Sequence, residues 1–299
     1  MSEGTTDGHI LSGFFFFIYG VWWSINSILV YLSGKHKLPI KQEGIYKKEN
    51  LRYKSYIPLP VLTKIPVEPI LKVVLPFLGV LSEAFLVVKD DEHNRHIIFS
   101  PFSMYNSTSP DHELIKNIAK VHHITLYSAF TLAGIVDLLS MKIEFPKHAA
   151  QIFLIFPFFT EFLIFYFHTK DGMRGSVELI LHWFLSNISL GSAIFAGLRS
   201  LNASNFLINT GFSVSLLLQG TWLFETGIVV HGAIHWTDTM NNVMFLVSCF
   251  VWHTISIVLG YLLLFCLMDC CLSRHLRKKS KSYKLLNEAE ETEMINISN

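Results

Sequence analysis

Histidine and glutamate side chains occur inside long apolar segments of this sequence. His122 and His123 open one segment, His182 lies about two turns into another, and His253 lies near the middle of the last. Ionisable groups in a bilayer are costly and usually face the bundle interior or a water-filled cavity. Imidazole is a good ligand for Zn, Cu, Fe and Ni, and a nearby carboxylate is a common further ligand or supporting partner. We therefore predict a site for a transition metal such as zinc, or for a haem, with His122, His123, His182, His253 and Glu161 as its core.

Several other residues are predicted to surround this site: His9, His168, Gln219, Glu225, Trp222 and Trp252. Glu161 lies seven residues before His168, so the two share a helix face and differ in depth by about 10 Å. The alternative is that these residues form a structural hydrogen-bond network or contact a substrate. His231 and His235 are four residues apart, but a loop at this position is equally consistent with the sequence.

The elements that would position these residues are apolar segments of membrane-spanning length. The chain is 51% hydrophobic and 16% charged, against about 25% charged residues in an ordinary soluble domain. Seven segments are long enough to cross a bilayer: residues 11–32, 70–88, 121–141, 149–168, 176–198, 206–230 and 242–268. Each should be helical, because lipid offers no partner for backbone amides. We predict an all-α membrane protein with a seven-helix domain over residues 1–268 and a disordered tail over 269–299.

The orientation follows from the basic residues between these segments. With the N-terminus outside, the cytosolic stretches carry 17 Lys and Arg residues and the outer stretches carry 6. This predicts an outer N-terminus and a cytosolic C-terminus. His9, His122, His123, His168 and His182 would then lie in or near the outer third of the membrane. The pocket would open outward.

Short signals at the membrane boundaries agree with this orientation. Asn106 begins a glycosylation acceptor in a stretch predicted to be outside. Cys270 and Cys271 sit beside a basic stretch and are candidates for S-acylation, or else plain boundary residues. The stretch from Tyr283 to Leu286 resembles an adaptor-read sorting signal, although a tail without a reader is an equal alternative. We expect the lipid bilayer as a partner and no nucleic acid.

Small residues in the first segment predict where helices approach closely. Gly13, Gly20 and the small Ser residues of this segment are candidate positions for close packing on a neighbouring helix. Asp137, deep in the third segment, is better explained by an interhelical hydrogen bond than by a proton relay.

Ordered blocks across the sequence resemble the transmembrane protein 45 family. They include Gly8-His9 with Gly13 to Trp23, His122-His123 with Gly134 to Asp137, Glu161-Phe162 with Phe165 to Thr169, His182, Leu218 to Trp222, and Trp252-His253. The resemblance implies a seven-helix protein of endosomal, Golgi or plasma membranes and carries no established activity. Ser12 stands where family members often have Pro, and Lys170 where they often have a second His, so position 170 is no essential ligand.

Two function classes remain after this comparison, and the sequence leaves open whether the protein is an enzyme. One is a membrane protein with a bound metal or haem, such as a zinc hydrolase with three ligands and an open position. The other is a non-enzymatic trafficking adaptor or ligand-binding protein. A G-protein-coupled receptor is excluded, because the third segment ends without Asp-Arg-Tyr and the seventh lacks Asn-Pro-x-x-Tyr. No inverted repeat supports a secondary transporter.

Overall fold

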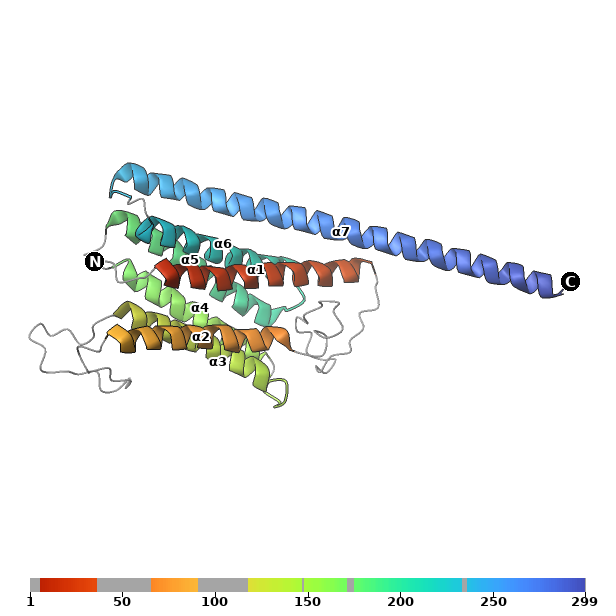
Figure 1. Ribbon diagram of the computed structural model, residues 1–299, viewed down its shortest axis with the longest axis horizontal. Helices are drawn as coiled ribbons and strands as arrows, with labels where there is room; N and C mark the ends of the chain where they lie inside the picture. The colour runs from red at the N-terminus through yellow and green to blue at the C-terminus, as the bar shows by residue number, and fades with distance from the viewer. Residues whose placement is uncertain are drawn as a thin grey trace, which may run out of the picture.

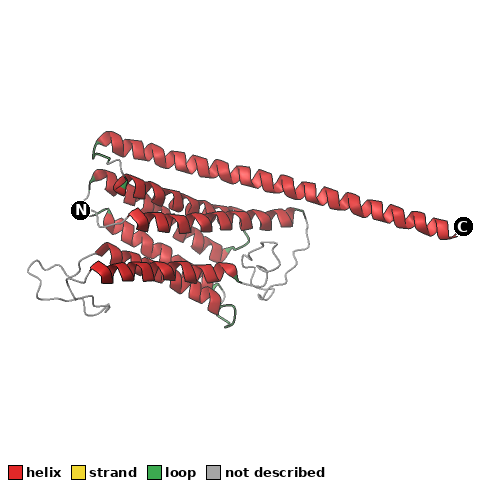
Figure 2. Cartoon of the chain, viewed as in Figure 1, coloured by secondary structure: helices red, strands yellow, loops and turns green. Residues whose placement is uncertain are grey.

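Seven helices make up the part of the chain that the structure describes. The structure, a computed structural model, describes residues 6–36, 66–90, 118–146, 148–170, 175–232 and 236–298, and these contain no strand. The helices are α1 (Thr6–Lys35), α2 (Val67–Asp90), α3 (Ile118–Leu139), α4 (Ala149–His168), α5 (Ser176–Leu201), α6 (Phe206–His231) and α7 (Met240–Ser298). They lie roughly side by side, as Figures 1 and 2 show. The prediction of an all-helical chain with about seven helices is confirmed.

Five of the helices are long and apolar enough to cross a membrane. They are α1, α4, α5, α6 and α7. Helices α2 and α3 pack mainly against each other and contain four buried or nearly buried charged residues, Glu68, Lys72, Glu83 and Asp137. Five helices therefore have the length and composition to cross a membrane. Helices α2 and α3 instead bring charged groups into the bundle.

Glycines let α1 lie directly against α6. A Cβ atom on Gly220 would come within 2.6 Å of the Phe17 backbone nitrogen and 2.8 Å of the Gly13 carbonyl oxygen. A Cβ atom on Gly20 would come within 2.8 Å of the Leu217 backbone nitrogen. Only residues without a side chain permit this separation, as in other close helix pairs of membrane proteins. The predicted packing role of Gly13 and Gly20 is confirmed.

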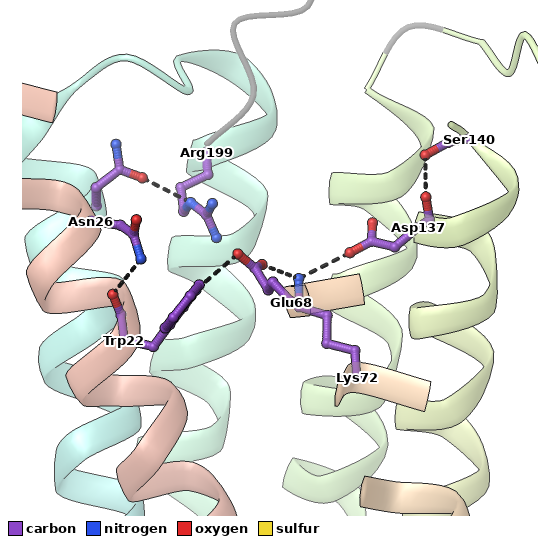
Figure 3. Close-up of polar contacts among 8 residues, drawn as sticks. Trp22, Asn26, Glu68, Lys72, Asp137, Ser140 and Arg199 are labelled. Atoms are coloured by element: carbon purple, nitrogen blue, oxygen red, sulfur yellow. Dashed lines mark hydrogen bonds and ion pairs between the residues drawn. The ribbon is translucent and has the colours of Figure 1, made fainter. Parts of the chain in front are cut away.

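A buried charge cluster joins α2 and α3 to α1 (Figure 3). The Lys72 ammonium lies 2.6 Å from a Glu68 carboxylate oxygen and 2.9 Å from an Asp137 carboxylate oxygen. The Trp22 indole N–H donates a hydrogen bond of 3.2 Å to Glu68. Asp137 therefore makes an interhelical contact, and Lys72 is accommodated in an apolar helix because two carboxylates surround it.

Arg199 adds a second cation near the charge cluster (Figure 3). The sequence places Arg199 just after a predicted segment, among the cytosolic basic residues, but the residue lies in the last turn of α5 and is 5% exposed. Its Nε donates to the Asn209 side-chain oxygen at 2.9 Å, and its guanidinium lies 4.0 Å from the centre of the Trp23 ring. Partial desolvation strengthens such cation–π contacts.

Helix α7 covers one side of the bundle and continues past it (Figure 1). It packs on α6, α5 and α1, and its apolar residues such as Leu259 and Leu263 are mostly exposed, as expected of a helix facing lipid. Near the C-terminal end of α1, Lys35 and His36 both contact Asp269, at 2.9 and 3.0 Å. The helix extends beyond residue 268, the predicted end of the last apolar segment, to Ser298. The predicted disorder of the tail stays a prediction.

Candidate functional site

Six histidines from five helices meet at one end of the bundle. This is the end at which α1, α3 and α5 begin and at which α4 and α6 finish. The histidines line a single cavity together with Glu161, and we call this cavity the histidine pocket; they are His9 on α1, His122 and His123 on α3, His168 on α4, His182 on α5 and His231 on α6.

Ring contacts connect all six histidines. The His168 ring centre lies 5.1 Å from that of His122 and 5.3 Å from that of His182. The His9 ring centre lies 6.1 Å from that of His182, 6.4 Å from that of His123 and 5.5 Å from that of His231. The imidazoles therefore form one continuous cluster rather than separate interfacial residues.

The closest pair of imidazoles is formed by His122 and His168. The Nδ1 atom of His122 lies 3.3 Å from the Nε2 atom of His168. Ligand nitrogens about 2.0 Å from a tetrahedral zinc ion are roughly 3.3 Å apart. This pair therefore has the separation that a shared ion requires, and it also suits a direct hydrogen bond between a protonated and an unprotonated ring nitrogen.

Two histidines are oriented by hydrogen bonds from their Nδ1 atoms. The Nδ1 atom of His182 lies 2.9 Å from the Glu178 carbonyl oxygen, one turn earlier on α5. The Nδ1 atom of His123 lies 2.9 Å from a Glu83 carboxylate oxygen on α2. The His182 contact requires an Nδ1–H donor, and the His123 contact with a carboxylate favours one. In their neutral forms both rings then have the lone pair on Nε2. Histidines that ligate metals are commonly held in this way.

Glu161 lies at the inner side of the histidine pocket and is fully buried. The Gln219 side-chain amide donates a hydrogen bond to its Oε2 atom. Its Oε1 atom is also buried and has no hydrogen-bond partner among the described residues. A buried carboxylate oxygen without a donor is costly, so this atom is suited to a proton, a water molecule or a cation.

Gln219 continues the polar contacts into the bundle core. Its side-chain oxygen lies 3.4 Å from the Ser192 hydroxyl, which donates at 3.0 Å to Ser215. Trp222, one turn along α6, donates its indole N–H to the Leu181 carbonyl at 3.1 Å. Gln219 thus contacts a pocket residue directly, whereas Trp222 fixes α6 against α5 beside His182.

His253 lies apart from the histidine pocket. Its Nε2 atom is 3.8 Å from a Glu225 carboxylate oxygen, and its ring centre is 5.6 Å from that of Trp222. Neither His253 nor Glu225 is among the described residues that line the pocket. Trp252 is 55% exposed and contacts Phe245 on the same helix. His253 therefore contacts residues of α6 from its place on α7 and lies outside the cluster.

The structure adds three residues to the candidate site that the sequence does not assign to it. His231 is the last residue of α6, at a position where a loop is equally consistent with the sequence, and it contacts His9. Glu178 lines the pocket, whereas Glu83 does not line it but holds His123 through a contact with its Nδ1 atom. All three lie toward the end of their helices that faces the pocket, so position along the helix is the signal that could have found them.

The side chains as they stand do not form a ready coordination shell. Within the described ranges, no group of three His, Cys, Asp or Glu side chains already has the arrangement that would hold a metal ion. The cavity of the histidine pocket has a volume of about 40 Å³. A water molecule needs at least roughly 10 to 15 Å³ of such space, so the pocket has room for an ion or a few waters.

The other sites predicted from the sequence lie away from the histidine pocket or outside the described residues. Asn106 falls outside the described residues. Cys270 and Cys271 are exposed on α7, and the stretch from Tyr283 to Leu286 is part of the same helix. Their predicted modification and recognition stay predictions.

Residues 147–266 match the family model of a family of unknown function, DUF716. The matched region contains α4, α5, α6 and most of the apolar part of α7. It therefore includes Glu161, His168, His182, Gln219 and His231, while His9, His122 and His123 lie before it.

Proposed function

We propose that this chain is a multi-pass membrane protein that binds a transition-metal ion, zinc in the first instance, in the histidine pocket. The observation that carries the proposal is the pair formed by His122 and His168, with ring nitrogens 3.3 Å apart. His182 is the third proposed ligand, because its ring adjoins that of His168 and its Nδ1 atom contacts a backbone carbonyl. Three ring nitrogens on one ion would leave the fourth position open, as in catalytic zinc sites.

Glu161 is proposed to balance the charge of the ion. Its Oε1 atom has no partner among the described residues, and its helix also carries His168. A carboxylate here can accept a hydrogen bond from a water on the ion or ligate the ion directly. The set differs from the sequence-based one by the inclusion of His168 and the omission of His123 and His253.

A haem is less well supported than an ion. The cavity of about 40 Å³ is far too small for a porphyrin. A planar macrocycle would also have to separate rings that are now in edge contact, such as those of His168 and His182.

The proposed orientation places this pocket toward the lumen or the cell exterior. It rests on the excess of basic residues in the stretches at the opposite end of the bundle. The resemblance to the transmembrane protein 45 family favours endosomal, Golgi or plasma membranes. The match to DUF716 over residues 147–266 is compatible with this resemblance.

The alternative is a non-enzymatic adaptor or ligand-binding protein in which the histidines form a structural network. The contacts between His123 and Glu83 and between Gln219 and Glu161 favour it, because both form without an ion. In this case the exposed Cys270 and Cys271 would anchor α7 by acylation, and the stretch from Tyr283 to Leu286 would recruit a sorting adaptor.

Metal analysis of the purified full-length protein separates the two functions. We expect about one zinc per chain after equilibration with zinc and removal of excess. His182→Ala and His168→Gln should each lose most of it, whereas His253→Ala, a membrane histidine outside the pocket, should retain it. Zinc absent from a wild-type protein with a cooperative thermal transition would overturn the proposal, as would equal loss in His253→Ala.

A further inference from the structure

Helix α5 presents a polar side chain on the outside of the bundle, near the middle of the helix. Asn187 is the twelfth of the 26 residues of α5 and is exposed. At 1.5 Å per residue it lies about 16 Å from the start of the helix, which is about half of a hydrocarbon core of roughly 30 Å. Helix α5 is one of the five helices long and apolar enough to cross a membrane. In a bilayer the amide of Asn187 would therefore face lipid.

This amide is only partly satisfied within the chain. Its Nδ2 atom donates a hydrogen bond of 2.7 Å to the Trp183 carbonyl oxygen, one turn earlier on α5. Its Oδ1 atom and its second N–H have no partner among the described residues. Lipid supplies neither a donor nor an acceptor, so an unpaired amide is costly there. The side chain thus lacks one donor and one acceptor, and a second amide would supply both.

Asn187 belongs to a continuous outward-facing seam of α5. Trp183 lies four residues before it and Ile194 seven residues after it, and these side chains are 47% and 55% exposed. Spacings of four and seven residues return to the same face of a helix. A Cβ atom on Gly191, four residues after Asn187, would meet nothing within 4 Å. The seam therefore has an open notch beside the amide, and such small residues let membrane helices approach closely.

The symmetry of a membrane favours a second copy of the chain as the partner of this seam. Copies of one chain share one orientation in the bilayer, so the two-fold axis of a dimer is normal to the membrane. Residues near this axis meet their own counterparts at the same depth. An amide has both a donor and an acceptor, so two Asn187 side chains can satisfy each other by reciprocal hydrogen bonds. A carboxylate or an ammonium group could not pair with its own copy in this way.

We propose that the outward-facing seam of α5 is the dimer interface of the protein, with the Asn187 side chains of the two copies paired at the two-fold axis. Trp183 and Ile194 pack on the same seam of the other copy, and Gly191 permits the close approach. One polar residue in an otherwise apolar seam also fixes register and helix number, as it does in coiled coils. The interface is independent of the proposed zinc site, because His182 on the same helix is buried.

Dilution of the fluorescently labelled full-length protein in liposomes tests the inference. Single-molecule photobleaching gives the dimer fraction at each protein-to-lipid ratio, and we expect a reversible equilibrium between monomer and dimer. Asn187→Leu should raise the dissociation constant about tenfold, through the loss of two interhelical hydrogen bonds. Asn187→Gln keeps the amide and should retain most of the dimer. Phe156→Leu is the control, because Phe156 is 52% exposed at a similar depth on α4 and should leave the equilibrium unchanged.

Oxidative cross-linking locates the contact while the amide of Asn187 stays in place. With the four native cysteines replaced by Ser, Ile194→Cys should form a disulfide with its own copy. Leu132→Cys should not, because Leu132 is 44% exposed but lies on α3, away from the seam.

Three results would overturn the inference. They are a protein that stays monomeric throughout the dilution series, an Asn187→Leu dimer as strong as that of the wild type, and equal cross-linking of the two cysteine variants. Thermal unfolding checks that Asn187→Leu is folded, as expected of an exposed position. Should this variant fail to fold, the cross-linking pair still decides.

Discussion

The Nε2 atom of His168 lies 3.3 Å from the Nδ1 atom of His122, although the residues are 46 positions apart in the chain. One residue ends α4 and the other begins α3. Antiparallel neighbours bring the end of one helix to the start of the other, so the pair results from the order of the helices. The same reasoning explains how His9, His182 and His231 reach this end of the bundle.

Glu83→Gln should weaken zinc binding several-fold, because Glu83 fixes His123, which lines the pocket beside the proposed ligands without being one of them. Glu83 holds His123 at the wall of the pocket, and its replacement removes a buried charge as well as the carboxylate acceptor. A competition titration with a fluorescent zinc chelator measures the change. Glu144→Gln, an exposed carboxylate in the loop after α3, serves as the control, and equal affinity of the two variants would contradict the role of Glu83.

Lys72→Met should destabilise the protein by about 3–5 kcal/mol, because it leaves Glu68 and Asp137 as uncompensated carboxylates in the bundle. Thermal unfolding in detergent should show a clear fall in the transition temperature. The triple variant Lys72→Met, Glu68→Gln, Asp137→Asn should recover much of the loss. A triple variant no more stable than Lys72→Met would show that the charge cluster is not the cause.

Gly220→Ala should loosen the contact between α1 and α6, because the added Cβ atom would meet backbone atoms of Gly13 and Phe17. Backbone cannot move aside as a flexible side chain can, so we expect a loss of about 1–3 kcal/mol, as in overpacked cores. Gly260→Ala is the matched control, since a Cβ atom there meets nothing within 4 Å. Similar transition temperatures for both variants would contradict close packing at Gly220.

The proposed orientation predicts opposite accessibility of the two sides in intact cells. Asn106 should carry an N-linked glycan that Asn106→Gln removes, and an epitope after Asn299 should be detected only after permeabilisation. A shift on gels after glycosidase treatment and antibody staining measure the two sides separately. Staining of the C-terminal epitope in unpermeabilised cells would reverse the orientation.

The sequence by itself determined that the chain is helical and suited to a membrane. Apolar runs of this length must be helical in lipid, because the backbone has to satisfy its own hydrogen bonds. It also indicated which histidines share a depth, since depth follows from position along a helix. Gly13 and Gly20 were recognisable because their small size is itself the property that permits close packing.

Only the tertiary structure decided which residues at that depth face one another. Depth does not specify the direction in which a helix turns its side chains, so His253 and Glu225 could be predicted in the pocket and yet lie between α6 and α7. The partners of Lys72 come from α2 itself and from α3, and no pattern within α2 identifies Asp137 as one of them. Pairing across helices depends on rotation and neighbour order, which are set by the packing of all seven helices together.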